Sequence, residues 1–343
     1  MQVQQLMSNN SPKPHPFLRI IRSQPYVYST MCKSLLFYSR HVAAKPERTV
    51  YKQSRSLFSM TDLETKHCDE LRNQGFTILH RFFSFELVDR IYEKADKLFK
   101  ALELDFYDAY SVQNGWRSSL KGLSYEELEA SEKMVALQNP LLNIPECVHM
   151  TFHESILKIV SNFLKCVPSW YKPMIVRDFP SNRPKEASNF HRDNDEADSI
   201  QIFVYLVDID DTRGPLIYIP CTNKYDVRSC RPRLNRDLGI NADDGRISDV
   251  EIEKYYPKET WKALRTKRGS IAIIHGNGLH KGPSWPRYGD PANKPRTALR
   301  LDITGPKLRG NNTKVQERKI RRPDFEQLNS LQRLFARNFV IID

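Results

Sequence analysis

The sequence lacks long hydrophobic stretches and closely spaced cysteines. No run of about 18 apolar residues occurs in its 343 residues, so no membrane-spanning helix is expected. The absence of any Cys-x-x-Cys pair argues against a zinc ribbon or a disulfide framework and favours a reducing compartment. The six scattered cysteines are Cys32, Cys68, Cys147, Cys166, Cys221 and Cys230.

Acidic residues are scarce at both ends of the chain. Residues 1–60 hold nine Lys or Arg against one Glu, a net charge of +8, and residues 305–343 hold nine against four, a net +5. Subtracting both from the +12 of the whole chain leaves −1 for residues 61–304. A nearly neutral body with basic ends is not a basic binding face, so no nucleic-acid partner is expected.

The first 60 residues are also rich in serine and arginine, which is the composition of an organelle transit peptide. A disordered extension without a targeting role is the alternative interpretation. We therefore expect a leader over residues 1–60, and a mitochondrial location if the source is eukaryotic. Otherwise a cytoplasmic location is expected.

Helix signals dominate the start of the folded region, which we place near Thr61. Thr61 or Asp62 can cap a helix that Gly75 ends in a left-handed conformation. Residues 76–79 then read as a strand, and Ser84 can cap the next helix. Apolar residues at helical spacing give that helix a core-facing stripe. The stripe consists of Leu87, Ile91, Ala95, Leu98 and Leu102.

Strand and turn signals alternate in the second half. Two further helices, over residues 124–137 and 151–166, come before this region. No regular alternation of strands and helices occurs, which argues against a parallel sheet. The predicted class is therefore α+β with a mainly β core, an antiparallel double-sheet barrel with the N-terminal helices packed on one side. The expected strands are 174–176, 200–207, 214–219, 269–274 and 297–303.

The triplet His191-Arg192-Asp193 carries the strongest chemical signal. On an extended segment, side chains at i and i+2 point to the same face, so the histidine and the aspartate can bind one metal ion. The triplet His67-Cys68-Asp69 has the same spacing, but on a predicted helix its side chains diverge by about 200°. Such a short motif arises easily by chance, so its surroundings must decide.

Two histidines downstream are candidates for a third ligand. His275 extends the predicted strand 269–274, while Gly276 and Gly278 allow the chain to bend before His280. Either histidine would complete a two-histidine, one-carboxylate iron site.

Arg296 and Arg300 share one face of the following strand by alternation. A guanidinium is a planar fork that binds a carboxylate through two hydrogen bonds, which a lysine does not reproduce. Both arginines are therefore candidates for binding a carboxylate. Arg300 can alternatively pair with a nearby acid such as Asp302.

Four blocks of sequence resemble one known family. They are HCDELRNQGFTILHRFFSFELVDRI, VDIDDTRGPLIYIPCTNK, GSIAIIHGNGLHKGPS and RTALRLDITG. In this order they resemble the phytanoyl-CoA dioxygenase-like family of iron(II)- and 2-oxoglutarate-dependent oxygenases, over about residues 61–305. The resemblance implies a double-stranded β-helix, or jelly-roll, core with the metal at its mouth. It also implies Fe(II) as cofactor, and 2-oxoglutarate and O2 as cosubstrates.

The resemblance assigns His191 and Asp193 as metal ligands and favours His280 over His275 as the third. His275 is then a cavity-lining or core residue. For the distal carboxylate of 2-oxoglutarate, the family pattern favours Arg296 over Arg300.

One departure concerns the family's serine two residues after the distal histidine. This chain has Gly282 there, with Ser284 two residues further on, which removes one expected hydrogen bond to the cosubstrate.

Other residues are expected to line the site. Phe203 and Tyr205 share a strand face and can border the 2-oxoglutarate pocket, with Met174 as a weaker candidate. Aromatic strand residues that merely fill the barrel are the alternative. Arg177 and residues 181–189 precede the metal triplet and are expected to contact the substrate.

Two further segments have open roles. Residues 223–268 separate the two halves of the site and form either a lid or padding. Residues 306–343 form a basic tail with a helix, in which Lys319, Arg321 and Arg322 can meet a CoA phosphate.

The predicted function is hydroxylation of a small organic or lipid-like substrate, with release of succinate and CO2. Retention of Asp193 favours hydroxylation or a related oxidation over halogenation, because halogenating relatives have a small residue there. The alternatives are a catalytically silent jelly-roll binding protein and a metal-dependent cupin-type enzyme that does not use 2-oxoglutarate. The sequence specifies neither the substrate, which includes whether it is a CoA thioester, nor the oligomeric state.

Overall fold

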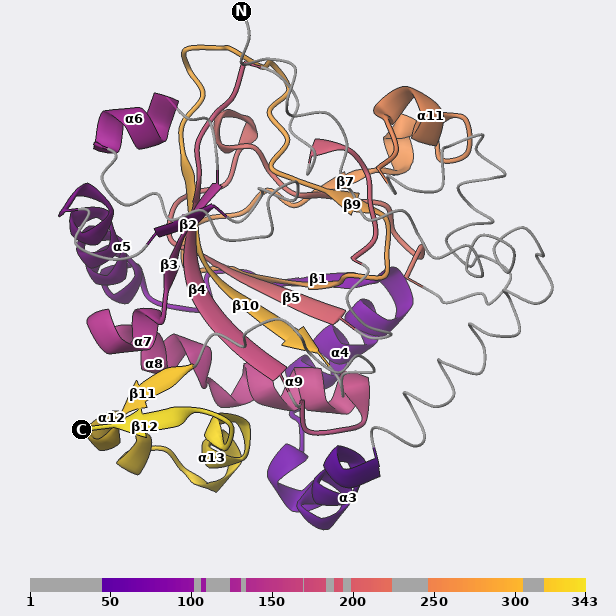
Figure 1. Ribbon diagram of the computed structural model, residues 1–343. Helices are drawn as coiled ribbons and strands as arrows, with labels where there is room; N and C mark the ends of the chain where they lie inside the picture. Colours follow the sequence, from indigo (N-terminus) through magenta and orange to yellow (C-terminus); the bar gives the residue numbers. More distant parts are fainter. Residues whose placement is uncertain are drawn as a thin grey trace, which may run out of the picture.

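Two antiparallel sheets and a layer of helices make up the folded body in the computed structural model (Figure 1). None of the described helices is long and apolar enough to cross a membrane. The structure describes residues 45–101, 106–108, 124–130, 134–168, 170–182, 188–193, 199–223, 246–304 and 318–343.

The large sheet contains seven strands, and every neighbouring pair is antiparallel. The two longest strands lie side by side near its middle and pair along their whole length, with Arg296 opposite Asp178 at one end. In spatial order the strands are β1 (Phe76–Leu79), β8 (Ile271–His275), β5 (Ser199–Tyr205), β10 (Arg296–Thr304), β4 (Trp170–Asp178), β3 (Met134–Gln138) and β2 (Phe106–Asp108).

Alternation divides the side chains of this sheet between two cores. Residues such as Ile202, Ile273 and Leu301 belong to a large core shared with the helices. Their sequence neighbours Phe203 and Ala272 belong to a second core, which includes residues beside the small sheet. Because successive strand residues point to opposite faces, the central strands are buried on both sides.

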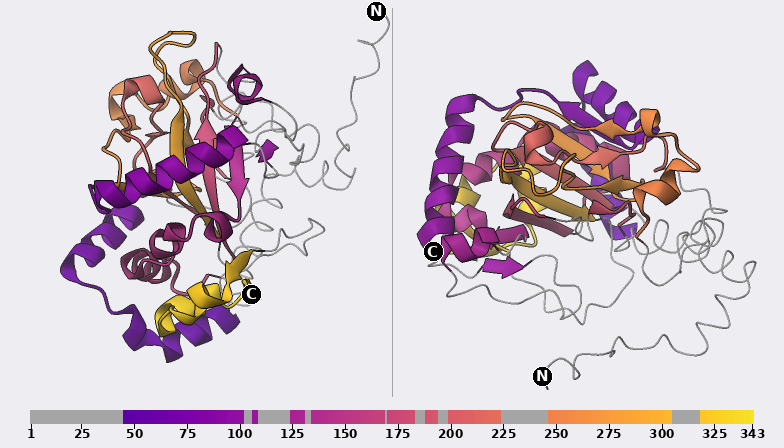
Figure 2. Two further views of the ribbon diagram at one scale, coloured as in Figure 1. Left: turned by 90° about the vertical axis from the view of Figure 1, so that its left-hand side faces the viewer. Right: turned by 90° about the horizontal axis from the view of Figure 1, so that it is seen from above.

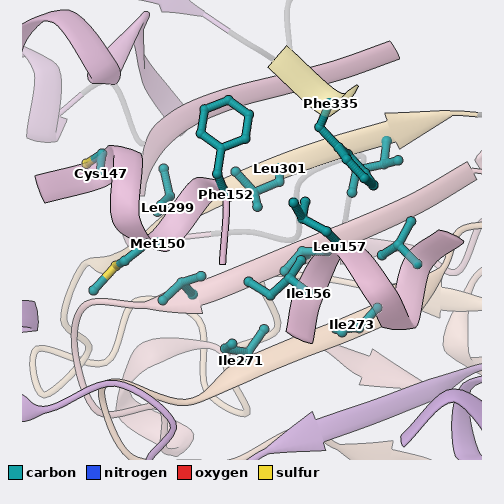
Figure 3. Close-up of a cluster of buried hydrophobic side chains, with 14 of the residues drawn as sticks. Cys147, Met150, Phe152, Ile156, Leu157, Ile271, Ile273, Leu299, Leu301 and Phe335 are labelled. Carbon is teal, nitrogen blue, oxygen red and sulfur yellow. The ribbon is translucent and has the colours of Figure 1, made fainter. Parts of the chain in front are cut away.

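Helices cover the first of these faces (Figure 2). Figure 3 shows Ile156 and Leu157 of one helix packed near Ile273 and Leu301 of the sheet. The helices of this layer are α4 (Asp62–Gln74), α5 (Phe85–Ala101), α7 (Pro140–Asn143), α8 (Glu146–Thr151) and α9 (Glu154–Leu164).

Local signals set the ends of α4 as expected. The hydroxyl of Thr61 accepts a hydrogen bond from the Glu64 amide, and the Glu64 carboxylate accepts one from the Thr61 amide. Gly75 ends the helix with φ at 89°, a conformation that favours glycine.

The small sheet lies on the other side, in the order β7 (Lys262–Ala263), β6 (Ile217–Tyr218) and β9 (His280–Lys281). Two isolated bridges extend it. His191 pairs with His280, and Phe190 pairs with Ile247. The side chains of Phe190, Ile247 and Leu279 belong to a third small core, with Ile219 and Ile252.

The antiparallel β core and the helices beside it confirm the predicted fold class at this level. All five expected strands are present, although β6 is shorter than predicted. The described residues form two facing antiparallel sheets and a separate parallel pair of strands in the C-terminal segment, and no closed barrel is assigned among them.

The helix predicted over residues 124–137 is wrong in its second half. A short helix, α6 (Tyr125–Ala130), is present, but β3 follows it. Residues 134–137 are apolar and buried on both faces, so their pattern carries no strand period, and pairing with β4 decides their conformation.

The stripe predicted on α5 is displaced by about one residue at its ends. Ile91 and Ala95 are buried as expected, but Val88 and Phe99 are fully buried where we predicted Leu87 and Leu98. Leu102 lies outside the described residues.

Both ends of the described chain join the large core. Residues 45–58, which we placed in the leader, form α3 (Lys45–Gln53) and η2 (Arg55–Phe58), and Tyr51 donates a hydrogen bond to Asn162 of α9 at 2.7 Å. Residues 1–44 lie outside the described part.

The C-terminal segment contains more structure than the single helix expected. The side chains of Ile320, Leu331, Phe335 and Phe339 are buried in the large core. Two of the basic residues considered for CoA are paired, Arg321 with Asp324 and Arg322 with Asp343. The elements are β11 (Lys319–Arg321), α12 (Arg322–Glu326), α13 (Ser330–Ala336) and β12 (Val340–Ile342).

The segment considered as a lid is described only from residue 246 onward. It forms α11 (Asp249–Glu253), η7 (Lys258–Thr260) and β7. Residues 224–245 lie outside the described part.

Replacing Phe335 tests whether the C-terminal segment stabilises the body. Because this ring is buried in the large core, Phe335→Ala should lower the free energy of unfolding by about 3–5 kcal/mol. Chemical denaturation measures the change. Val340→Ala, at a side chain that is 42% exposed, is the control and should shift stability by less than about 0.5 kcal/mol. Equal effects of the two substitutions would contradict the packing described.

Candidate metal centre

His191, Asp193 and His280 come together at the edge of the small sheet. Each offers one ligand atom, and these atoms all lie within 4.8 Å of one another. His280 Nε2 is 3.8 Å from Asp193 Oδ1, and the two imidazole ring centres are 4.5 Å apart. The sequence prediction that these three side chains converge is confirmed, whereas metal binding by them stays a prediction.

Main-chain hydrogen bonds fix this convergence. The His191 amide donates to the His280 carbonyl at 2.9 Å, and the His280 amide donates back at 3.0 Å. In such an antiparallel pair both side chains rise from the same face. The amide of Asp193 donates to the Gly276 carbonyl at 2.8 Å, which anchors the other end of the triplet.

A second hydrogen bond orients each imidazole ring. His191 Nδ1 lies 2.9 Å from the Asn189 carbonyl, and His280 Nδ1 lies 2.9 Å from the Gly278 carbonyl. Because a carbonyl oxygen can only accept, each Nδ1 carries the proton and leaves the Nε2 lone pair for a metal.

Burial keeps both imidazoles neutral. It holds the pKa of His191 well below its ordinary value, and the neighbouring His280 adds to the effect. Burial also lowers the pKa of His280, although the Asp193 carboxylate opposes this shift. Neutral imidazole is the form that coordinates a metal.

Gln201 and two glycines hold the Asp193 carboxylate and its surroundings. Gln201 donates a hydrogen bond to Asp193 Oδ2 at 2.7 Å. A Cβ on Gly276 would lie only 2.3 Å from that same oxygen, and a Cβ on Gly278 would lie 1.7 Å from the Tyr218 hydroxyl oxygen. These glycines are therefore required for space, and neither has a positive φ.

Tyr218 packs behind the distal histidine. Its ring stacks parallel to that of His280 at 6.1 Å between centres, and its hydroxyl donates to the His275 carbonyl at 2.9 Å. Burial raises the pKa of this hydroxyl, which therefore stays protonated. Sequence reasoning missed Tyr218 and Gln201. For Gln201, its position between two isoleucines in the buried strand β5 was a signal.

His275 does not join the ligand cluster. It ends β8 opposite Ile200, and its ring packs edge-on against Phe163 of α9 at 5.0 Å. By alternation it shares the helix-side face with Ile273. The structure therefore brings His280, and not His275, to the other two predicted ligands. In the second triplet of this spacing, His67-Cys68-Asp69, the His67 Nδ1 atom lies 2.8 Å from the Thr77 hydroxyl.

Arg296 is buried in an ion pair that the sequence did not predict. Its Nε and Nη2 lie 3.0 and 2.7 Å from Asp178 Oδ2, and its Nη1 donates to the Gly214 carbonyl at 3.2 Å. A Cβ on Gly282 would lie 3.6 Å from Arg296 Nη1. The position where the family often has serine thus adjoins this guanidinium.

The other predicted pocket residues lie with Arg296 on the inner face of the large sheet, which is the face turned toward the small sheet and away from the helices. Phe203 lies between the two arginines, with its ring centre 6.0 Å from the Arg296 guanidinium carbon and 5.7 Å from that of Arg300. Met174 pairs with Arg300 across the strands. Arg300 also donates to Asp302 at 2.7 Å, as the alternative interpretation expected.

Tyr205 is fully buried beside this group. Its ring stacks on Phe203 at 6.2 Å, and its hydroxyl makes no hydrogen bond to any residue that the structure describes. Burial raises the pKa of Tyr205 to about 12, so the hydroxyl is a donor at neutral pH. A buried donor without a partner is costly, which makes it a candidate ligand contact.

The prediction that Arg177 contacts the substrate is wrong. Arg177 points to the helix side, where it pairs with Asp96 at 2.8 Å and packs over the ring of Phe99. The alternation of β4 places it opposite to Met174 and Val176, which face inward. Of the segment 181–189, residues 183–187 lie outside the described part.

The donor set fits Fe(II). Two neutral imidazole nitrogens and one carboxylate form the two-histidine, one-carboxylate facial set of non-haem iron oxygenases. The second hydrogen bond of each histidine, and that of the carboxylate to Gln201, are the supports that such ligands usually have.

Substitution of the two histidines in β8 and β9 separates their roles. His280→Ala should weaken Fe(II) binding by about 100-fold or more, because it removes one of three ligands, whereas His275→Ala should leave the affinity within about threefold. Anaerobic equilibrium dialysis measures both. Retained affinity in folded His280→Ala, or loss in folded His275→Ala, would overturn the ligand set.

Several solved structures share a distant likeness with the chain. The epimerase SnoN from nogalamycin biosynthesis, in complex with Fe3+, alpha ketoglutarate and nogalamycin RO, is 15% identical, with 71% of this chain and 83% of that chain covered and a TM-score of 0.46. EvdO2 from Micromonospora carbonacea var. aurantiaca is 18% identical, with 74% and 95% covered and a TM-score of 0.45. HygX from Streptomyces hygroscopicus, with nickel and 2-oxoglutarate bound, is 12% identical, with 76% and 91% covered and a TM-score of 0.45.

The family match is stronger than these likenesses, and the assignment rests on it alone. No curated protein matches the chain. The model of the family described as phytanoyl-CoA dioxygenase (PhyH) matches residues 71–284, which is more than half of the 343 residues and includes all three clustered side chains. The chain belongs to the phytanoyl-CoA dioxygenase family.

Proposed function

We propose that this protein is an Fe(II)- and 2-oxoglutarate-dependent oxygenase that hydroxylates a small organic or lipid-like substrate and releases succinate and CO2. The observation that carries the proposal is the convergence of His191, Asp193 and His280 in a member of this family. In this proposal, the two facing sheets are the halves of the family's jelly-roll core.

The chain supplies positioning and charge for this reaction. Fe(II) held by the three ligands would supply O2 activation coupled to oxidative decarboxylation of 2-oxoglutarate. The Nδ1 hydrogen bonds of both histidines keep the Nε2 atoms directed at the metal, and Gln201 holds the carboxylate. His280 is buried, whereas His191 and Asp193 are half-buried.

We assign the distal carboxylate of 2-oxoglutarate to Arg296 and Tyr205. Both side chains lie on the inner face of the large sheet, and the Arg296 charge acts on the Tyr205 hydroxyl. The unpartnered Tyr205 hydroxyl takes the place of the serine donor that Gly282 lacks. Asp178 holds the guanidinium in a fixed orientation from one edge.

One observation favours a different function. The ion pair with Asp178 neutralises the charge of Arg296 before any cosubstrate arrives. This pairing would be compatible with a catalytically silent binding protein, which does not need a free positive charge on Arg296 because it does not bind 2-oxoglutarate. Anaerobic addition of 2-oxoglutarate to the Fe(II) protein separates the two functions, since only the oxygenase gives a metal-to-ligand charge-transfer band.

Loss of either residue of the metal triplet should abolish cosubstrate turnover. His191→Ala and Asp193→Ala each remove a ligand, so succinate formation from 2-oxoglutarate should fall by about 100-fold or more. The triplet His67-Cys68-Asp69 provides a matched control, because Asp69→Ala removes an exposed acid with the same spacing and should retain full turnover. Unchanged succinate formation in folded Asp193→Ala would disprove the assignment.

Two substitutions on the inner face test the cosubstrate anchor. Arg296→Gln should be combined with Asp178→Asn, because removal of the arginine alone would leave a buried unpaired carboxylate. This double variant should raise the dissociation constant of 2-oxoglutarate about tenfold or more, and Tyr205→Phe about fivefold, through loss of their hydrogen bonds. Titration of the charge-transfer band reports both values.

Arg300→Gln is the comparison for this experiment. If Arg300→Gln weakens 2-oxoglutarate binding more than the Arg296 double variant does, the anchor is Arg300 and the assignment above is wrong. The Asp178→Asn single variant shows how much of the effect comes from the ion pair itself.

A further inference from the structure

Arg246 lies next to the predicted metal ligands. It precedes Ile247, which pairs with Phe190 in an isolated antiparallel bridge. Ile247 and Phe190 exchange two main-chain hydrogen bonds, each of 2.9 Å, in an antiparallel pair. In this register Arg246 stands opposite His191. His191 in turn stands opposite His280 across its other edge.

The side chains of this row can be placed by alternation. Phe190, Ile247 and Leu279 all lie in the third core, on one face of the small sheet. The residues next to them, His191, Arg246 and His280, must therefore rise from the opposite face. That face carries the three predicted metal ligands.

Nothing in the described chain accounts for the Arg246 guanidinium. Its Nη1 is buried and has no hydrogen-bond partner, and no ion pair among the described residues involves it. The nearby acids have other partners, since Asp193 accepts from Gln201 and Asp249 binds Lys281. Arg246 as a whole is half-buried, but a buried guanidinium nitrogen without a partner is costly, which makes it a candidate contact for an anionic ligand.

We propose that Arg246 binds an oxyanion of the substrate, a carboxylate or a phosphate, next to the metal. The inference rests on the proposed oxygenase function and narrows its substrate class to acids. A planar guanidinium binds either group through two hydrogen bonds.

The position of Arg246 also limits where the acid lies in the substrate. The side chains of Arg246 and His191 begin about 5 Å apart and rise from the same face, so an oxyanion bound by Arg246 lies within the reach of one arginine side chain from the ligand cluster. In the proposal, the acidic group is therefore within that reach of the carbon that is oxidised. In a CoA thioester the phosphates are separated from the acyl carbons by the long pantetheine arm, so such a substrate does not meet this requirement through its phosphates.

Small anions test the site without knowledge of the substrate. Titration calorimetry of the metal-free protein with acetate and with inorganic phosphate should show weak binding of at least one anion. Arg246→Gln should weaken it about tenfold or more, and Arg246→Lys should retain part of it, because lysine keeps the charge but loses the fork. Which anion binds more tightly distinguishes a carboxylate substrate from a phosphorylated one.

A matched control is available on the surface. Arg265→Gln removes an exposed arginine that pairs with Asp211, and it should leave anion binding unchanged. Thermal melting and circular dichroism establish that each variant is folded. Identical anion binding by wild-type protein and folded Arg246→Gln would overturn the proposal.

A second measurement separates the substrate from the cosubstrate. In the anaerobic Fe(II) protein saturated with 2-oxoglutarate, the anion should bind without bleaching the charge-transfer band, and Arg246→Gln should change 2-oxoglutarate affinity by less than about threefold. Displacement of 2-oxoglutarate by the anion would assign Arg246 to the cosubstrate and overturn the proposal. Absence of the band in wild-type protein would instead refute the oxygenase function, while the calorimetry on metal-free protein would still report on Arg246.

Discussion

The antiparallel pairing of His191 with His280 is the constraint on which the other parts of the site depend. Their two reciprocal main-chain hydrogen bonds join the segment of the metal triplet, residues 188–193, to β9, which lies about ninety residues later in the sequence. With this register set, the side chains of Tyr218, His280, His191 and Arg246 follow one another across the face of the small sheet. The metal site is therefore positioned by main-chain geometry, which varies less than flexible side chains do.

Close approach of side chains to the backbone is the second requirement. Gly276 and Gly278 leave room for the Asp193 carboxylate and for the Tyr218 hydroxyl, respectively. A methyl group at Gly276 would displace the predicted ligand Asp193, and one at Gly278 would displace Tyr218, which packs behind His280. The segment between the two histidines of the second half thus has a spatial role that composition alone, which indicates only a bend, does not reveal.

The sequence predicted features that depend on local patterns. Capping residues placed α4 correctly, and alternation placed Phe203 with Tyr205 on one strand face and Arg296 with Arg300 on the face of another strand. Alternation also indicated that Arg177 faces away from the site, a consequence that we did not draw. β3 was missed because residues buried on both faces show no strand period.

Features that depend on distant partners could not be predicted in this way. The ion pair of Asp178 with Arg296 and the place of Arg246 opposite His191 follow from strand register, which joins residues far apart in sequence. A single sequence contains the local periods of each strand but not the register between them. His191 and Asp193 were found because their spacing within one extended segment is itself a local pattern, whereas His280 was chosen over His275 from the family pattern.

The packing of the C-terminal segment has a consequence for synthesis of the chain. Phe335 and Phe339 belong to the large core, yet they come later in the sequence than every residue of the candidate metal centre. A nascent chain that already contains the whole metal centre, but not yet these two residues, still exposes apolar surface on the helix side of the sheet. Until they emerge, that surface is a site for aggregation or for binding by chaperones.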